Sequence, residues 1–228
     1  MTPDTAAAAR DNLVVTMRQR CFWLFALLLL LLVSVPFLEA SPGGRIALNV
    51  ASLLTLIAGA TAITRRAGAT LITLLLAVPT ALSLLLAVVY DQPQFRVGSQ
   101  VFGAAFYFAV TSYLLSYTLR RDVMTMDKLY GAAAAFLLLG VLWGFLYSIL
   151  LTFYPGALAI NGAPMTGAAA PSTMLYFSFV TLTATGMSDV MPVHPVARML
   201  CSLEMITGVL FIAVLIARLA GSYPPREG

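Results

Sequence analysis

The chain has 228 residues, of which 61% are hydrophobic and only 10% are charged. Soluble domains are about 45–50% apolar and about 25% charged, so this composition excludes an ordinary soluble protein and indicates an integral membrane protein. The formal net charge of +4 does not by itself indicate a function. We expect the lipid bilayer as a partner and do not expect nucleic acid. An enzyme is not expected, because no cluster of His, Cys or acidic residues in the sequence suits catalysis.

A membrane-spanning helix needs about 20 mostly apolar residues. The segments that meet or nearly meet this requirement are Cys21–Leu38, Ile46–Thr64, Ala69–Tyr90, Val97–Leu119, Leu129–Phe153 and Val196–Leu219. The first is interpreted as a retained span, because it lacks a clear small-residue cleavage site. The predicted fold class is therefore all-α and transmembrane, with six membrane-spanning helices.

Basic residues predict the orientation of these spans, because they are enriched in cytoplasmic loops. With the N-terminus inside, the basic residues on the inner side are Arg10, Arg18, Arg20, Arg65, Arg66, Arg120, Arg121, Lys128, Arg218 and Arg226. Those on the outer side are Arg45, Arg96 and Arg198. We therefore expect a multi-pass protein of the cell inner (plasma) membrane with both termini in the cytoplasm.

The two ends of the chain are short. The N-terminal segment, residues 1–20, is predicted to be either an amphipathic helix on the inner surface or a partly ordered tail. The tail at 222–228 is expected to be cytoplasmic and too short for a regulatory domain.

The region 21–121 contains four predicted spans but lacks the arginines of a voltage sensor. The fourth span, Val97–Leu119, has no Arg, Lys, Asp or Glu. Voltage sensing needs several charges within the membrane, each worth about 2.3 kcal/mol per 100 mV. We therefore expect weak voltage dependence.

The stretch between the fifth and sixth segments has the pattern of a pore loop. Residues 154–171 are uncharged and rich in Ala, Gly and Pro, which predicts an extracellular loop over a pore entrance. Ser172 is a candidate N-cap for a pore helix over 172–183, whose core is about 15 Å long, or half a bilayer. Irregular backbone follows at 183–189, and at membrane depth it is tolerated only in protein or along a water-filled path. The pattern predicts a re-entrant helix followed by a conducting loop.

The segment Tyr176–Asp189 (YFSFVTLTATGMSD) resembles the pore helix and selectivity filter of potassium channels, whose filter reads Thr-Val-Gly-Tyr-Gly-Asp. Residues 129–221 as a whole resemble the pore domain of small bacterial six-span channels of this superfamily, with an outer helix at 129–153 and an inner helix at 196–221. The resemblance implies a homotetramer, since each chain supplies one of four filter loops, and no cofactor besides K⁺ as the permeant ion. K⁺ would be bound by the backbone carbonyls of Thr183, Ala184, Thr185, Gly186 and Met187.

The filter segment also departs from the family pattern. Gly186 matches the first filter glycine and Asp189 the closing aspartate, which is expected to concentrate monovalent cations at the mouth or to hold the end of the filter. The replaced positions are Ala184 for Thr, Thr185 for Val or Ile, Met187 for Tyr and Ser188 for the second Gly. These departures leave three interpretations open: a potassium channel, a weakly selective cation channel, or a non-conducting tetrameric scaffold.

Two residues of the last span are candidates for functional roles. Glu204 is the carboxylate within a predicted span, and such a residue is a functional candidate by default. It either faces the cavity below the filter or supports the filter from behind, bonded to a pore-helix hydroxyl such as that of Thr181. By resemblance Gly208 is a gating hinge, and the alternative is that it permits close helix packing.

Overall fold

The computed structural model of the chain describes residues 20–41, 43–44, 47–48, 50–52, 54–55, 75–82, 93–119, 125–167, 169–186 and 189–221. This part is mostly helical and contains four helices that are long and apolar enough to cross a membrane. They are α2 (Arg20–Leu38), α5 (Pro93–Thr118), α6 (Met126–Phe153) and α8 (Pro195–Ala220). Most of the second and third predicted spans, at 46–64 and 69–90, lies outside the described residues.

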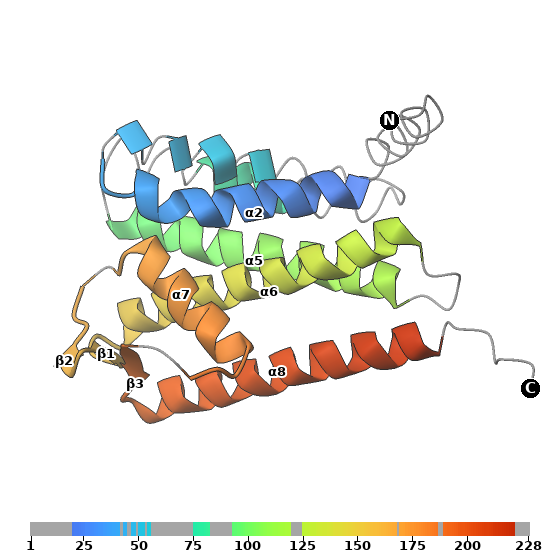
Figure 1. Cartoon of the computed structure of the whole chain (residues 1–228). Helices are drawn as coiled ribbons and strands as arrows, with labels where there is room; N and C mark the ends of the chain where they lie inside the picture. Colours follow the sequence, from blue (N-terminus) through green and yellow to red (C-terminus); the bar gives the residue numbers. More distant parts are fainter. Residues whose placement is uncertain are drawn as a thin grey trace, which may run out of the picture.

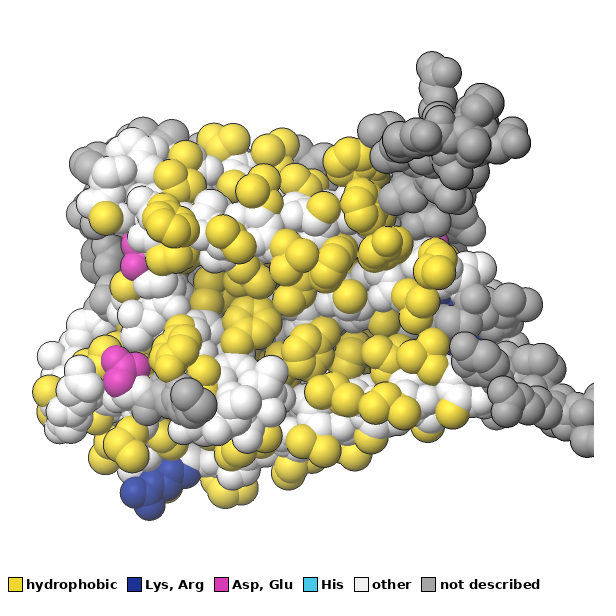
Figure 2. All heavy atoms as spheres, in the orientation of Figure 1, with side chains coloured by type: hydrophobic (Ala, Val, Ile, Leu, Met, Phe, Trp, Pro, Cys, Tyr) yellow, Lys and Arg dark blue, Asp and Glu magenta, His cyan; other side chains and the backbone are white. Residues whose placement is uncertain are grey.

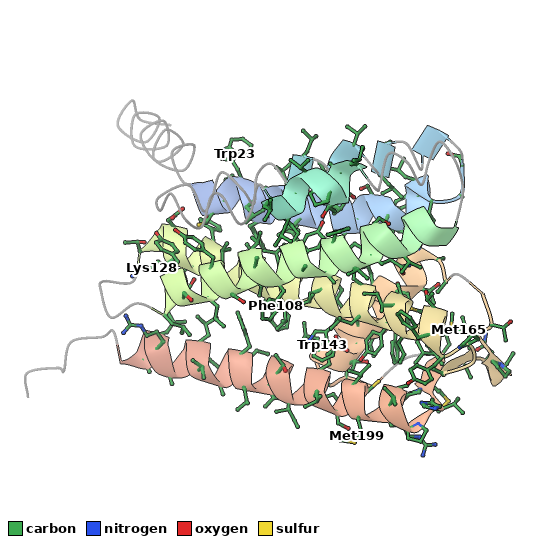
Figure 3. All side chains as sticks on the ribbon, turned by 180° about the vertical axis from the view of Figure 1, so that it is seen from behind. Trp23, Phe108, Lys128, Trp143, Met165 and Met199 are labelled. Atoms are coloured by element: carbon green, nitrogen blue, oxygen red, sulfur yellow. The ribbon has the colours of Figure 1, made fainter. Side chains whose placement is uncertain are left out.

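The long helices alternate in direction (Figure 1). Helices α2 and α6 run toward the end of the molecule that carries a small sheet, and α5 and α8 run away from it. Lys128, near the start of α6, and Met165, beside the sheet, mark the two opposite ends in Figure 3. Alternating directions of this kind are expected of helices that cross a membrane one after another.

Helix α6 lies at the centre of the packing. It contacts α2, α5, α7 and α8, and 61% of its apolar span is buried, against 17% for α8. Its alanines and glycines allow neighbours to approach closely, and the Tyr107 ring of α5 stacks on Phe145 with 5.4 Å between ring centroids. The core therefore forms around α6, and most of α8 remains uncovered in the single chain.

The surface follows the membrane pattern. Hydrophobic side chains cover the middle of the face shown in Figure 2, while acidic side chains are visible at the end that carries the sheet. On α8, Met199 is 63% exposed and points away from the rest of the chain (Figure 3). Such a surface suits contact with lipid or with other apolar helices.

The small sheet is absent from the all-α prediction. It consists of β1 (Leu158–Ile160), β2 (Ala163–Pro164) and β3 (Val190–Pro192) in the order β2-β1-β3, with both pairings antiparallel. Asn161 and Gly162 form the turn of the β1–β2 hairpin with φ values of 50° and 83°. Asn-Gly is the preferred pair for a two-residue hairpin turn, because both positions need a positive φ. This local signal is present in the sequence, in the segment predicted as an extracellular loop.

The short helix α7 (Pro171–Leu182) has 12 residues and is therefore about 18 Å long. Figure 1 shows it slanting from the end of α2 toward the middle of α8. It begins at Pro171, which suits the first helical position because the N–H that proline lacks has no partner there. Ala170 occupies the N-cap position, so the prediction that Ser172 is the N-cap is wrong.

Candidate functional site

Helix α7 packs on α6 at two glycines of α6, Gly140 and Gly144. A Cβ added to Gly140 would lie 2.4 Å from the Phe179 ring, and one added to Gly144 would lie 3.4 Å from the Leu175 side chain. Glycine removes the side chain that would hold two helices apart, which is the usual reason for small residues at membrane helix interfaces. The Gly140–Gly144 pair thus allows α7 to lie close against the half of α6 that is nearer the sheet; ends on this side of the molecule are called outer, and those on the opposite side inner.

Gly208 of α8 meets the other end of α7. A Cβ at this position would lie 1.8 Å from the carbonyl oxygen of Leu182, the last residue of α7. That contact is with backbone, which cannot move aside as a side chain can. Of the two roles predicted for Gly208, close packing is therefore a requirement of this geometry.

The outer end of α7 is held by a carboxylate from a distant part of the chain. Glu39 follows the last residue of α2, and its side chain accepts hydrogen bonds from the backbone N–H of Ser172, at 3.1 Å, and from the Ser172 hydroxyl. A carboxylate at a helix N-terminus satisfies free N–H groups and interacts favourably with the helix dipole. Glu39 therefore links the first span to the start of α7.

The inner end of α7 closes on itself. Thr183 is the C-cap, the Ala184 N–H donates to the Thr181 carbonyl at 2.9 Å, and the Thr185 N–H donates to the Val180 carbonyl at 3.1 Å. This pair of bonds is the Schellman motif, in which the residue after the C-cap adopts a left-handed conformation. Ala184 is that residue, with φ of 54°, where glycine is normally preferred.

The threonine hydroxyls complete this end of the helix. The Thr183 hydroxyl donates to the Phe179 carbonyl at 2.7 Å, and the Thr185 hydroxyl lies 3.1 Å from the Val180 carbonyl. The two hydroxyls are themselves 3.0 Å apart. In the single chain these side chains are therefore engaged with the end of α7.

The predicted filter residues occupy the turn that follows. Thr183, Ala184, Thr185 and Gly186 are exposed, and Gly186 has a positive φ of 71°. Met187 and Ser188 lie outside the described residues. The backbone changes from a right-handed residue, Thr183, to a left-handed one, Ala184, so the chain turns away from the helix axis at the end of α7.

The outer end of the loop is tied to the small sheet. The carbonyl of Asp189 accepts a hydrogen bond from the Asn161 N–H at 3.0 Å, and Val190, the first residue of β3, is 2% exposed. Asp189 itself is exposed. His194 is the N-cap of α8, where its Nδ1 accepts from the Val196 N–H at 3.3 Å. The sheet therefore positions the backbone at which the loop ends.

Glu204 is fully buried at the junction of α6, α7 and α8. Its carboxyl oxygens lie 2.6 Å from the Ser178 hydroxyl of α7 and 2.5 Å from the Tyr147 hydroxyl of α6. Thr181, the expected partner, instead donates to the Phe177 carbonyl at 2.8 Å within its own helix. The structure thus places Glu204 against α7, bonded to the Ser178 hydroxyl and not to that of Thr181, which was the example given in the prediction.

Sequence reasoning missed Glu39, Tyr147 and Ser178. Glu39 is separated from Ser172 by 133 residues, and no local pattern pairs them. Ser178 lies within the predicted pore helix between Phe177 and Phe179, and a serine in that place signals only that a polar side chain needs a partner. The signal available for Glu39 was its position, as an acid directly after an apolar segment.

The comparisons with known proteins bear on the same region. A family model described as an ion channel matches residues 135–222, a range that contains most of α6, all of α7, the loop and α8. The comparisons with curated proteins and with solved structures gave no match. The match confirms the resemblance to ion channels over this range.

Proposed function

We propose, from the premise that residues 135–222 belong to the ion-channel superfamily, that the chain is one subunit of a tetrameric potassium channel. One observation carries the proposal: α7 is a half-length helix between two spanning helices and ends in an exposed, irregular turn. Such backbone is stable at membrane depth where it borders water or protein, which is the environment of a pore. The proposed path for K⁺ runs along this turn.

The ion ligands in this proposal are backbone carbonyls of the loop. Carbonyl dipoles can replace the hydration shell of a cation, and the carbonyl end of a helix carries partial negative charge. The residues whose carbonyls would serve are Thr183, Ala184, Thr185, Gly186 and Met187. Asp189, at the outer end, would raise the local concentration of monovalent cations.

The exposed face of α8 supports an assembly of several chains. Only 17% of its apolar span is buried, and large side chains along it are open: Met199, Leu203, Ile206, Val209, Leu210 and Ile216. In a tetramer, one part of this face would contact neighbouring chains and another would line the conduction path. Four loops would then meet on one axis, as the proposed filter requires.

The proposed topology has six spans in the plasma membrane, with both termini in the cytoplasm. Helices α2 and α5 run in opposite directions, as the first and fourth of consecutive spans do (Figure 1). Arg218, in the last turn of α8, lies at the end opposite the sheet, which supports a cytoplasmic position for that end. The loop and the sheet would then face the outside.

A weakly selective cation channel is the second candidate. It is favoured by the state of the threonines, because the hydroxyls of Thr183 and Thr185 are engaged with the end of α7 and Ala184 supplies none. A filter with fewer hydroxyl and carbonyl ligands discriminates less between K⁺ and Na⁺.

The test is ion flux through purified protein in liposomes, with K⁺ and Na⁺ compared and with barium as a blocker. Strong preference for K⁺ and block by barium would support the first proposal. Equal flux of both ions would favour the weakly selective channel. Absence of flux from a reconstituted tetramer would contradict both and favour the non-conducting scaffold. Cross-linking in the same membranes would report the number of chains independently.

A further inference from the structure

Glu204 belongs to a network of hydrogen-bonded polar groups that connects the three helices α6, α7 and α8. The members are Tyr147 of α6, Ser178 of α7, Cys201 and Glu204 of α8, and the carbonyl of Gly140 on α6. Tyr147 and Glu204 are fully buried, as is Ser178. In a membrane-spanning region each of these groups needs an internal partner, because hydrocarbon supplies none.

The hydrogen count of Ser178 decides how the set is connected. Its hydroxyl oxygen lies 2.7 Å from the Gly140 carbonyl oxygen and 2.6 Å from a carboxyl oxygen of Glu204. A serine hydroxyl has one hydrogen, and a carbonyl can only accept. If Ser178 donates to Gly140, the short contact with Glu204 is a hydrogen bond only when Glu204 donates.

The opposite assignment leaves a repulsive contact. If Glu204 were ionised and Ser178 donated to it, the Ser178 and Gly140 oxygens would face each other at 2.7 Å with no hydrogen between them. An ionised carboxylate in this place would also be a buried charge with no cationic side chain beside it among the residues that the structure describes. The nearest arginine along α8, Arg198, lies toward the outer end, where its Nε donates to the Pro192 carbonyl.

We propose that Glu204 is protonated and donates a hydrogen bond to Ser178, which in turn donates to the Gly140 carbonyl. This chain of hydrogen bonds from acid to serine to carbonyl, called the relay below, holds the proposed pore helix α7 between α8 and α6. The other carboxyl oxygen accepts from the Tyr147 hydroxyl at 2.5 Å, and the Tyr147 oxygen lies 3.4 Å from the Cys201 sulfur, close enough to accept its S–H. The titratable groups that face Glu204 are therefore Tyr147 from α6 and Cys201 from α8, both neutral, and α7 contributes only Ser178.

The relay positions the filter indirectly. Ser178 lies five residues before the C-cap of α7, and the loop begins at that C-cap. A shift of α7 between α6 and α8 would displace the carbonyls of the whole turn. Glu204 is thus a positioning residue. Of the two roles considered for it, the geometry supports the one behind the filter and not the one in the cavity below it. Its protonation and its contacts do not depend on conduction, whereas its effect on selectivity rests on the proposed function.

The test compares Glu204→Gln with Glu204→Ala, with Ser202→Ala as a control at a half-buried position of α8, where the serine hydroxyl donates to the Arg198 carbonyl of the same helix. A glutamine amide can donate to Ser178 and accept from Tyr147, so Glu204→Gln is expected to keep both the unfolding midpoint and the K⁺/Na⁺ permeability ratio close to the parent protein. Glu204→Ala leaves Ser178 and Tyr147 without this partner and is expected to lower both, the ratio several-fold. An equal loss in the two variants would show that a carboxylate is needed and would overturn the proposal.

Infrared difference spectroscopy of the parent protein against Glu204→Gln gives a readout that needs no ion flux. The proposal expects the carbonyl stretch of a protonated carboxyl group, present in the parent protein and lost in the variant. A carboxylate band in its place would overturn the proposal even if the protein conducts. The protonated band in a protein without flux would uphold the relay and contradict only the proposed function.

Discussion

The two ends of α7 are held in different ways. The outer end depends on Glu39, a side chain from the first span, whereas the inner end is closed by hydrogen bonds of its own last turn and by the close approach of Gly208. The inner end, at which the loop begins, is thus determined by residues of α7 and α8. The outer end is a point at which the segment after α2 bonds α7 directly, in addition to the packing of α2 and α7 on α6.

The largest expected effect comes from breaking the inner end. Gly208→Ala places a methyl group 1.8 Å from the Leu182 carbonyl oxygen in the structure, so backbone must move. Overpacking of this kind costs about 3 kcal/mol, and we expect unfolding of the purified protein at a lower temperature and loss of ion flux. The measurement is thermal unfolding in detergent, followed by flux in liposomes.

Gly131→Ala is the matched control for this variant. Gly131 also lies in a helix interior, but an added Cβ would meet Cys21 and Thr118 at 3.5 Å, an ordinary contact distance. Alanine gains about 1 kcal/mol over glycine in a helix, so this variant is expected to be neutral or slightly stabilising. Equal behaviour of the two variants would contradict the close packing of α8 on α7.

The same contrast explains what the sequence could predict. The spanning helices follow from apolar length, and α7 and the loop follow from a half-length segment with a Thr- and Gly-rich end; the bounds of α7 lie one residue earlier than the predicted 172–183. These features are local in the chain. The partners of Glu39 and Glu204 are not local, because they depend on how α2, α6 and α7 pack.

Local signals can also mislead when two of them compete. Ser172 is a good N-cap residue, but Pro171 before it starts the helix one residue earlier and leaves the serine inside the first turn. Its hydroxyl then bonds Glu39. Similarly, the Ala- and Gly-rich composition of 154–171 predicted only an extracellular loop, while the Asn161-Gly162 pair specified a hairpin. Average composition was less informative than the pair of residues at the turn.

The second prediction breaks the outer end. Glu39→Ala removes the acceptor for both the N–H and the hydroxyl of Ser172, and we expect the free energy of unfolding to fall by about 1–2 kcal/mol, the range for loss of a helix cap. Glu39→Gln keeps an acceptor but not the charge and is expected to lose about half as much. Thermal or chemical unfolding in detergent measures both.

A double-mutant cycle with Ser172→Ala isolates this link from other contacts of Glu39. The two side chains contact each other, so the effects of Glu39→Ala and Ser172→Ala should not add, with a coupling of about 1 kcal/mol. Strict additivity would mean that Glu39 does not hold the start of α7, and the comparison between the two ends would lose its basis.

The smallest expected effect is a gain in stability, in the variant Ala184→Gly, and it tests the description of the inner end of α7. Ala184 adopts a left-handed conformation with φ of 54°, which costs an alanine about 1–2 kcal/mol relative to glycine. Ala184→Gly relieves this strain but makes the unfolded chain more flexible, so we expect a net stabilisation of about 1 kcal/mol, measured by thermal unfolding in detergent.

Gly186→Ala is the reciprocal variant: the φ of Gly186 is 71°, and an added Cβ would meet nothing within 4 Å. Any loss of stability there would come from backbone strain alone. If Ala184→Gly were destabilising and Gly186→Ala neutral, the turn after α7 would not be the Schellman motif, and the inner end would need a different explanation.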